Sequence, residues 1–145
     1  MVTFEATAVS TSDTGLTVRA RDFEWLVDEP PSLGGKDTGP NPVEYVLGAL
    51  LGCLNVTVHL VAKERGVTLS SFSATARGDL DPAKFMGRST DARAGYSAIE
   101  VSIEVEGDDD STTLDDIAKV AEARCPVSDN LANDTPVTIN IVNKA

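Results

Sequence analysis

Two cysteines are the residues of this sequence best suited to carry chemistry, and they lie far apart along the chain, at Cys53 and Cys125. A thiolate is a nucleophile, two thiols can join as a disulfide, and a free thiol often packs as a small apolar side chain. Two cysteines are too few for a disulfide framework, and with the single histidine they are too few for a zinc site. The two thiols are therefore a catalytic pair, a structural disulfide or unpaired.

Cys125 stands in a context that favours a reactive thiol. Pro126 follows it and disfavours helical geometry at Cys125, so a helix that reaches Arg124 must stop there. Pro126 also suits the first position of a short helix through Leu131, whose N-terminal amides would lower the pKa of the sulfur. A buried junction residue is an equally weighted alternative. Cys53 lies in an apolar stretch, where simple packing is the more common role of a cysteine.

The polar neighbours of Cys53 on its predicted helix do not face it. At about 100° per residue, His59 lies about 240° and Glu44 about 180° around the helix from Cys53. Glu44 instead suits the first turn, where a carboxylate stabilises the helix N-terminus. Thr57, one turn beyond Cys53, is closer, but its hydroxyl is expected to bond back to its own helix.

Length and charge exclude several classes of protein. The 145 residues, 41% hydrophobic and 24% charged, predict one globular domain over residues 1–145. A net charge of −11 disfavours nucleic-acid and membrane-surface partners. Residues 1–10 lack a signal-peptide pattern, and the most apolar stretch, Val46 to Leu54, is shorter than the roughly 20 residues of a membrane span. We expect a cytoplasmic protein with reduced thiols, no metal and no cofactor.

The first half of the chain predicts strands followed by a long helix. Apolar and polar residues alternate in three segments typical of an antiparallel meander, residues 2–8, 16–20 and 23–27. A loop rich in glycine and proline follows, and Asn41 and Pro42 suit the cap and first position of a helix. That helix is expected to run to Arg65 and to stop at Gly66. It is apolar nearly all round from Val43 to Ala62, which indicates burial on most sides.

The second half predicts a strand pair, a helix and a closing strand. The two strands are residues 72–80 and 98–106, joined by a long excursion over residues 81–97. A helix begins at Ser111 or Thr112, and its apolar stripe is Leu114, Ile117, Val120 and Ala121. Residues 136–142 close the chain as a strand with Val137, Ile139 and Ile141 turned inward. The predicted order is βββ-α-ββ-α-β, an α+β domain with a long buried central helix.

Two cysteine motifs in these elements resemble the OsmC/Ohr family, the osmotically inducible protein C and organic hydroperoxide resistance proteins. The first motif is Asn41-Pro42-Val43-Glu44 with the helix leading to Gly52-Cys53, and the second is Cys125-Pro126-Val127-Ser128 before a closing strand. The resemblance covers most of the chain, from the loop at Asp28 onward. The two motifs together are fairly specific, whereas either one alone is weak.

The resemblance implies a cysteine-based peroxidase on an intertwined homodimer, with its active sites at the subunit interface. Cys53 matches the peroxidatic cysteine and Cys125 the resolving cysteine. The implied partners are a small organic hydroperoxide, or hydrogen peroxide, and a dithiol reductant, in oxidative or osmotic stress defence. An apolar surround suits organic hydroperoxides better than hydrogen peroxide.

The sequence departs from the family pattern beside the thiolate, and the departures leave three hypotheses open. Active members carry a glutamate directly after the helix-start proline that orients an arginine; here Val43 takes that position and Glu44 follows. The nearest basic residues are Arg19 and Arg21, so Arg21, Glu44 and Arg19 are the possible supporting residues. One alternative to the peroxidase is a protein of the same fold that binds a small apolar or electrophilic ligand in the interface pocket. A purely structural dimeric stress protein is the third.

Overall fold

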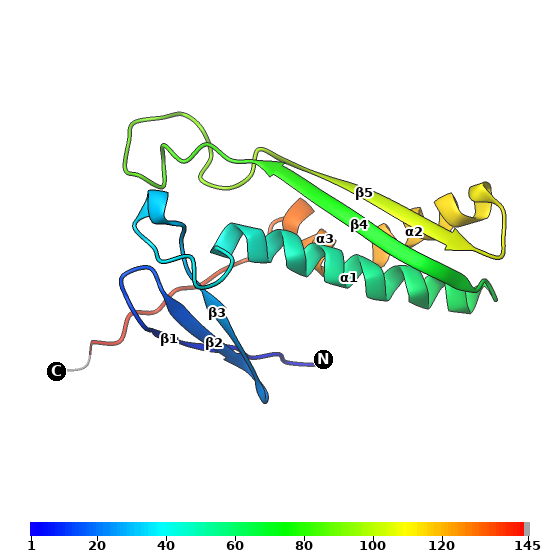
Figure 1. The fold of residues 1–145 in the computed structure, drawn as a ribbon, viewed down its shortest axis with the longest axis horizontal. Coiled ribbons are helices and arrows are strands. Elements are labelled where there is room, and N and C mark those ends of the chain that lie inside the picture. Colours follow the sequence, from blue (N-terminus) through cyan, green and yellow to red (C-terminus); the bar gives the residue numbers. More distant parts are fainter. Residues whose placement is uncertain (144–145) are drawn as a thin grey trace. The chain divides into compact units, whose positions relative to one another are not determined.

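A computed structural model describes residues 1–143 of the protein and confirms the α+β class. The chain divides into two compact units, residues 1–48 and the residues from Ala49 onward, and each is described by itself. The elements in chain order (Figure 1) are β1 (Thr7–Ser10), β2 (Leu16–Ala20), β3 (Phe23–Val27), a short 3-10 helix η1 (Pro31–Leu33), α1 (Pro42–Glu64), β4 (Leu69–Asp79), β5 (Ala98–Gly107), α2 (Ser111–Arg124) and α3 (Pro126–Ala132).

The first unit contains the predicted meander, a three-stranded antiparallel sheet in the order β1-β2-β3. The first strand begins at Thr7, whereas the alternation predicted a start near Val2. Thr7 lies opposite Arg19, and the chain turns from β2 into β3 at Arg21, which has a φ of 54°. Residues before Thr7 therefore extend past the end of β2 and have almost no partner strand to pair with. Val2 is accordingly 77% exposed.

A buried carboxylate holds together the loop after β3. Asp28 is 2% exposed, and its two oxygens accept five hydrogen bonds, from Thr14 Oγ1, Glu29 N, Lys36 N, Thr38 N and Thr38 Oγ1 at 2.9–3.2 Å. Burial by itself would raise the pKa of Asp28, but these hydrogen bonds outweigh it and hold the pKa well below its ordinary value. The ionised Asp28 therefore fixes the loop that leads to α1.

Two glycines let this loop fold closely against neighbouring backbone. A Cβ at Gly35 would lie 1.7 Å from the carbonyl oxygen of Glu29, and one at Gly39 would lie 2.5 Å from that of Leu26. Both distances are far inside a van der Waals contact, so any larger residue would push the loop away. The glycines therefore act through close approach of the backbone and not through a left-handed conformation.

The ends of α1 follow the sequence prediction closely. Asn41 Oδ1 accepts the Glu44 amide and Glu44 Oε2 accepts the Asn41 amide, both at 2.9 Å, which is a reciprocal capping box. At the other end, Gly66 takes a φ of 74°, and the amide of Val67 bonds back to Ala62 O.

The middle of α1 departs from the prediction, because the helix is not buried on most sides. Its buried residues form one stripe, Leu50, Leu54, Thr57, Val58, Val61 and Ala62. Other apolar residues face outward, and Val56 is 64% and Leu60 45% exposed. By length and composition alone α1 could also cross a membrane, with a mean hydropathy of 1.8 and a third of its residues buried in the most apolar window. Core helices of globular proteins have the same property.

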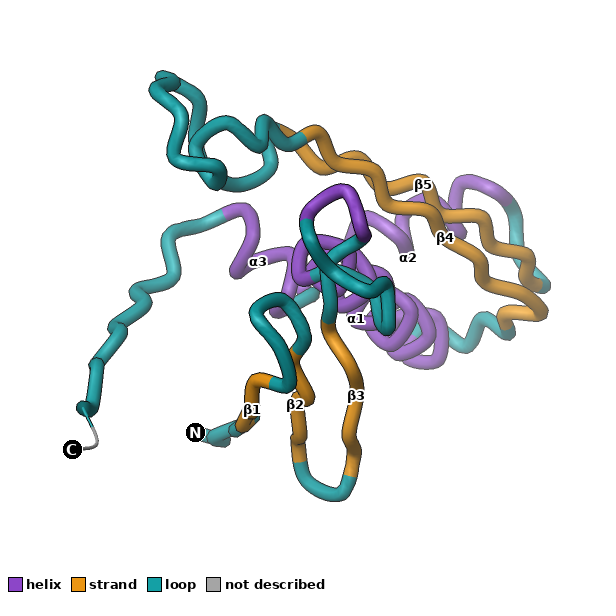
Figure 2. The backbone as a smooth tube through the Cα atoms, turned by 60° about the vertical axis from the view of Figure 1, so that its left-hand side comes forward, coloured by secondary structure: helices purple, strands orange, loops and turns teal. Residues whose placement is uncertain are grey.

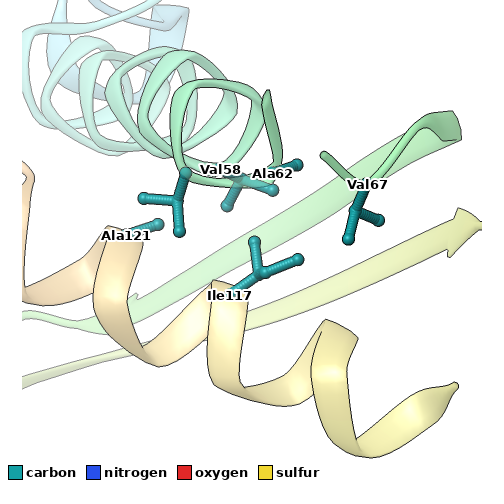
Figure 3. Packing of buried hydrophobic residues seen from close by; sticks show 6 residues of the cluster. Val58, Ala62, Val67, Ile117 and Ala121 are labelled. Carbon is teal, nitrogen blue, oxygen red and sulfur yellow. The ribbon is translucent and has the colours of Figure 1, made fainter. Parts of the chain in front are cut away.

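In the second unit, β4 and β5 form a long antiparallel ribbon beside α1 and α2 (Figure 2). β4 begins at Leu69, three residues before the predicted start, because Leu69 still pairs with Gly107 across a β-bulge. Val58 and Ala62 of α1 point toward Ile117 and Ala121 of α2 (Figure 3). The ribbon completes this core, because Leu69, Phe72 and Val105 pack against it.

The predicted closing strand over residues 136–142 is wrong for the described chain. Residues 133–143 form no strand and are drawn as loop in Figure 2. Val137, Ile139, Ile141 and Val142 are 80–85% exposed. An alternating pattern identifies a segment that can form a strand, but the strand forms only where another strand offers hydrogen bonds. The order observed is therefore βββ-α-ββ-α-α.

We predict that Asp28→Asn lowers the melting temperature by roughly 5 °C or more, because it places an amide donor among five donors. The pKa of Asp28 is lower in the folded than in the unfolded chain, so its stabilisation is present at neutral pH and is lost as the pH falls below 3.8. The difference in melting temperature should shrink accordingly in acid. Asp22→Asn, at an exposed turn, makes the same charge change and is the control. Equal melting temperatures for the two variants would contradict the role given to Asp28.

Candidate active site at the two thiols

The structure brings the two cysteine side chains together inside the second unit. Cys125 is 1% exposed and forms a small core with Leu50 and Leu54 of α1. Cys53 is half-buried and packs against this core together with Ile99, Val101, Ile103 and Val127. The two cysteines therefore pack in one cluster, and the Cys125 thiol is near enough to raise the pKa of Cys53. The two are free cysteines, and their surroundings are almost entirely apolar.

Cys125 is the single residue between α2 and α3, as the following proline predicted. It caps both helices in an extended conformation, with φ −79° and ψ 112°. Its Sγ accepts a hydrogen bond from the backbone amide of Ser128 at 3.4 Å. The backbone amide of Val127 lies near Cys53 and lowers the pKa of its thiol. The first two free amides after Pro126 are therefore both close to the sulfurs.

The surroundings of Cys53 favour the protonated thiol. Burial raises its pKa, the adjacent Cys125 thiol raises it further, and only the Val127 amide lowers it. None of these groups is a cation. At neutral pH the thiolate of Cys53 is therefore a minor species in the single chain.

The predicted supporting residues, all in the first unit, have partners close to them in the sequence. Arg19 Nε lies 2.6 Å from Glu24 Oε2 in an exposed ion pair. The guanidinium of Arg21 lies 4.9 Å from the ring centre of Phe23, and Glu44 belongs to the helix cap. A role for Arg19, Arg21 or Glu44 at the thiols stays a prediction.

Two other polar residues of α1 behave as the helix geometry predicted. Thr57 Oγ1 donates back to Cys53 O at 3.0 Å and to Leu54 O at 3.2 Å, so it is occupied by its own helix. His59 is exposed and bonds through Nδ1 to Asn55 O at 2.8 Å. Within residues 1–143, no group of three or more His, Cys, Asp or Glu side chains is placed to hold a metal ion.

The helix predicted after Pro126 supplies a backbone amide to the Cys125 sulfur, that of Ser128, as expected. An ion pair between Arg124 and Glu64, at the end of α2, was not predicted. No spacing rule relates two residues on different helices, so the sequence carried no signal for this contact.

The fold and the site together define an α+β protein with two free cysteines packed in one apolar cluster. The OsmC-like protein family model matches residues 35–140, so the chain belongs to the OsmC-like family. This confirms the resemblance carried by the two cysteine motifs. No curated protein matches the sequence.

Solved structures with the same fold include OsmC and hydroperoxide resistance proteins. An OsmC-like protein from Mycoplasma pneumoniae is 21% identical, with a TM-score of 0.77 over 90% of this chain and 88% of that one. An organic hydroperoxide resistance protein from Elizabethkingia anophelis is 22% identical, with a TM-score of 0.64 over 90% and 88% of the two chains. One from Legionella pneumophila is 19% identical, with a TM-score of 0.64 over 90% of each chain.

We predict that the pKa of Cys53 lies above its ordinary value of 9.0 and falls when Cys125 is replaced by alanine, because the Cys125 thiol raises it. The rate of alkylation by iodoacetamide, a neutral reagent, should therefore rise with pH to a midpoint above 9.0 in the reduced protein. Peptide mass spectrometry separates the labelling of Cys53 from that of the buried Cys125. A midpoint below 9.0, or no change in the Cys125→Ala variant, would contradict this electrostatic description.

Proposed function

We propose that this protein is a thiol-dependent peroxidase that reduces organic hydroperoxides through Cys53 and Cys125. The observation that carries the proposal is the contact between the two thiols in an apolar core. A lone packed cysteine needs no partner, whereas a peroxidatic thiol that is regenerated through a disulfide needs a second thiol within reach. Membership of the OsmC-like family and the fold shared with hydroperoxide resistance proteins support the same assignment.

The exposure of the two sulfurs divides the roles between them. Cys53 is half-buried and so can meet a substrate, whereas Cys125 is 1% exposed. The Cys53 thiolate attacks the terminal peroxide oxygen, the O–O bond breaks, and the alkoxide takes up a proton and leaves as an alcohol. Cys53 is then a sulfenic acid. The Cys125 sulfur attacks the Cys53 sulfur, and water leaves as the disulfide forms.

A dithiol reductant completes the proposed cycle. Its thiolate attacks the Cys53–Cys125 disulfide, and its second thiol releases the mixed disulfide, so the protein recovers both thiols and the reductant becomes the disulfide. The apolar side chains around the sulfurs, among them Leu50, Leu54 and Ile99, favour an organic hydroperoxide over hydrogen peroxide. Such chemistry suits stress defence in a reducing cytoplasm.

One observation favours a second candidate function, the binding of a small apolar or electrophilic ligand without turnover. The pKa of Cys53 is raised by burial and by Cys125, and no cation offsets this. A thiol in that state reacts slowly with peroxides but still packs against an apolar ligand. Steady-state turnover separates the two functions.

Replacing either cysteine should stop the cycle at a different step. With cumene hydroperoxide and dithiothreitol as substrates, Cys53→Ser should consume the hydroperoxide at least about a hundredfold more slowly than the wild type, because the nucleophile is gone. In the absence of any reductant, Cys125→Ser should still consume one equivalent of the hydroperoxide and accumulate a sulfenic acid at Cys53, detected with dimedone. Ser73→Ala, at an exposed position of β4 that is not in the cluster around the thiols, is a control expected to keep the wild-type rate. Equal rates for the wild type and Cys53→Ser would exclude the peroxidase and leave the ligand-binding function.

We also propose that the protein is a homodimer, because the single chain leaves much apolar surface uncovered. Val56 and Leu60 on α1 are 64% and 45% exposed, and Val137, Ile139 and Ile141 are 80–85% exposed. The alternation of residues 136–142 is that of a strand that lacks an edge to pair with. A second copy of the chain would cover apolar surface of this extent.

Sedimentation velocity tests the homodimer directly. We expect a species with twice the chain mass of 15.2 kDa at micromolar concentration. Ile139→Asp should shift the protein toward the monomer, because a carboxylate cannot be buried in an apolar contact without a partner. Asn140→Asp, at the neighbouring polar position of the alternating pattern, should leave the dimer intact. A wild-type protein that sediments as a monomer would refute the assembly.

A further inference from the structure

Two exposed ion pairs join the end of α1 to α2, and they differ in geometry. Arg124 makes a two-pronged contact with Glu64, with Nη1 2.6 Å from Oε2 and Nη2 3.0 Å from Oε1. Arg65 makes a single contact with Asp116 through Nη1 and Oδ2. A two-pronged arginine–carboxylate pair fixes the relative orientation of its partners, whereas a single contact leaves rotation free.

Glu64 lies on the same face of α1 as Cys53. The two residues are 64 − 53 = 11 positions apart, which at about 100° per residue is 1100°, or only about 20° beyond three full turns. The same spacing places them about 16 Å apart along the helix axis. One face of α1 therefore carries both the peroxidatic thiol and the carboxylate that binds Arg124.

Arg124 is the last residue of α2 and directly precedes Cys125. Cys125 packs in one cluster with Cys53, and Arg124 forms an ion pair with Glu64, so two consecutive residues attach the end of α2 to one face of α1. The ion pair is half exposed, with 41% of the Arg124 and 50% of the Glu64 side chain accessible. An exposed pair adds little to overall stability. Its main effect is on orientation.

We propose that Arg124 is a positioning residue, whose two-pronged pair with Glu64 holds the Cys125 thiol against Cys53 for disulfide formation. This inference rests on the proposed function, since disulfide formation is the resolving step of the cycle. In that step the Cys125 sulfur displaces the hydroxyl of the Cys53 sulfenic acid, and the hydroxyl leaves as water with the Cys125 proton. Without the ion pair, the end of α2 can turn and the sulfurs meet less often.

The test compares Arg124→Gln with Asp116→Asn, which removes the other ion pair between the same helices. Purified protein is equilibrated in mixtures of reduced and oxidised glutathione, and the Cys53–Cys125 disulfide is quantified by mass spectrometry. We expect the equilibrium constant for the disulfide to fall up to about fivefold in Arg124→Gln and to stay unchanged in Asp116→Asn. Both variants should melt close to the wild type. The exchanged pair Glu64→Arg with Arg124→Glu should recover most of the loss.

Glutathione drives the disulfide without any peroxide, so this result is independent of peroxidase activity. A wild-type protein that forms the disulfide but does not turn over hydroperoxide would refute the proposed function and leave the positioning role in place. A wild-type equilibrium constant in Arg124→Gln, an equal loss in Asp116→Asn, or no disulfide in the wild type would each overturn the positioning role.

Discussion

The conformation of Cys125 is the constraint on which the candidate site depends. Pro126 disfavours helical geometry at the preceding residue, so α2 ends at Arg124 and Cys125 adopts an extended conformation before α3 begins. This one residue turns the chain so that Cys125 packs in one cluster with Cys53 and its sulfur accepts the Ser128 amide. Without the break, a continuous helix would use these amides in its own hydrogen bonds and would leave none for the thiols.

The same packing that brings the sulfurs together also limits their reactivity. Burial beside Leu50, Leu54 and a second thiol raises the pKa of Cys53, and one backbone amide offsets only part of this. The closeness of the thiols favours disulfide formation in the proposed cycle, whereas the raised pKa of Cys53 disfavours its first step, which needs a thiolate. The site is therefore better arranged for forming a disulfide than for the initial attack.

Local chemistry explains most of what the sequence could predict. Caps at Asn41 and Gly66, the break at Pro126 and the alternation of β5 each depend on residues close in sequence, and all are found in the structure. The contacts that depend on distant residues were not predictable in this way. The hydrogen bonds of Asp28 to Lys36 and Thr38 and the Glu64–Arg124 pair belong to this group. The segment around Ile139 has the alternating pattern of a strand, but no strand pairs with it in the described chain. Alternation of apolar and polar residues does not specify which strand a segment pairs with.

If Cys53 and Cys125 form one redox unit, one equivalent of hydroperoxide should convert them into a disulfide, and the intact mass after a single turnover reveals it. One equivalent of cumene hydroperoxide is added to the reduced protein without any reductant. We predict that the intact mass falls by the mass of two hydrogens and that digestion yields a peptide in which Cys53 is linked to Cys125. A protein that keeps its reduced mass, or that gains oxygen at Cys53 while Cys125 stays a free thiol, would contradict it.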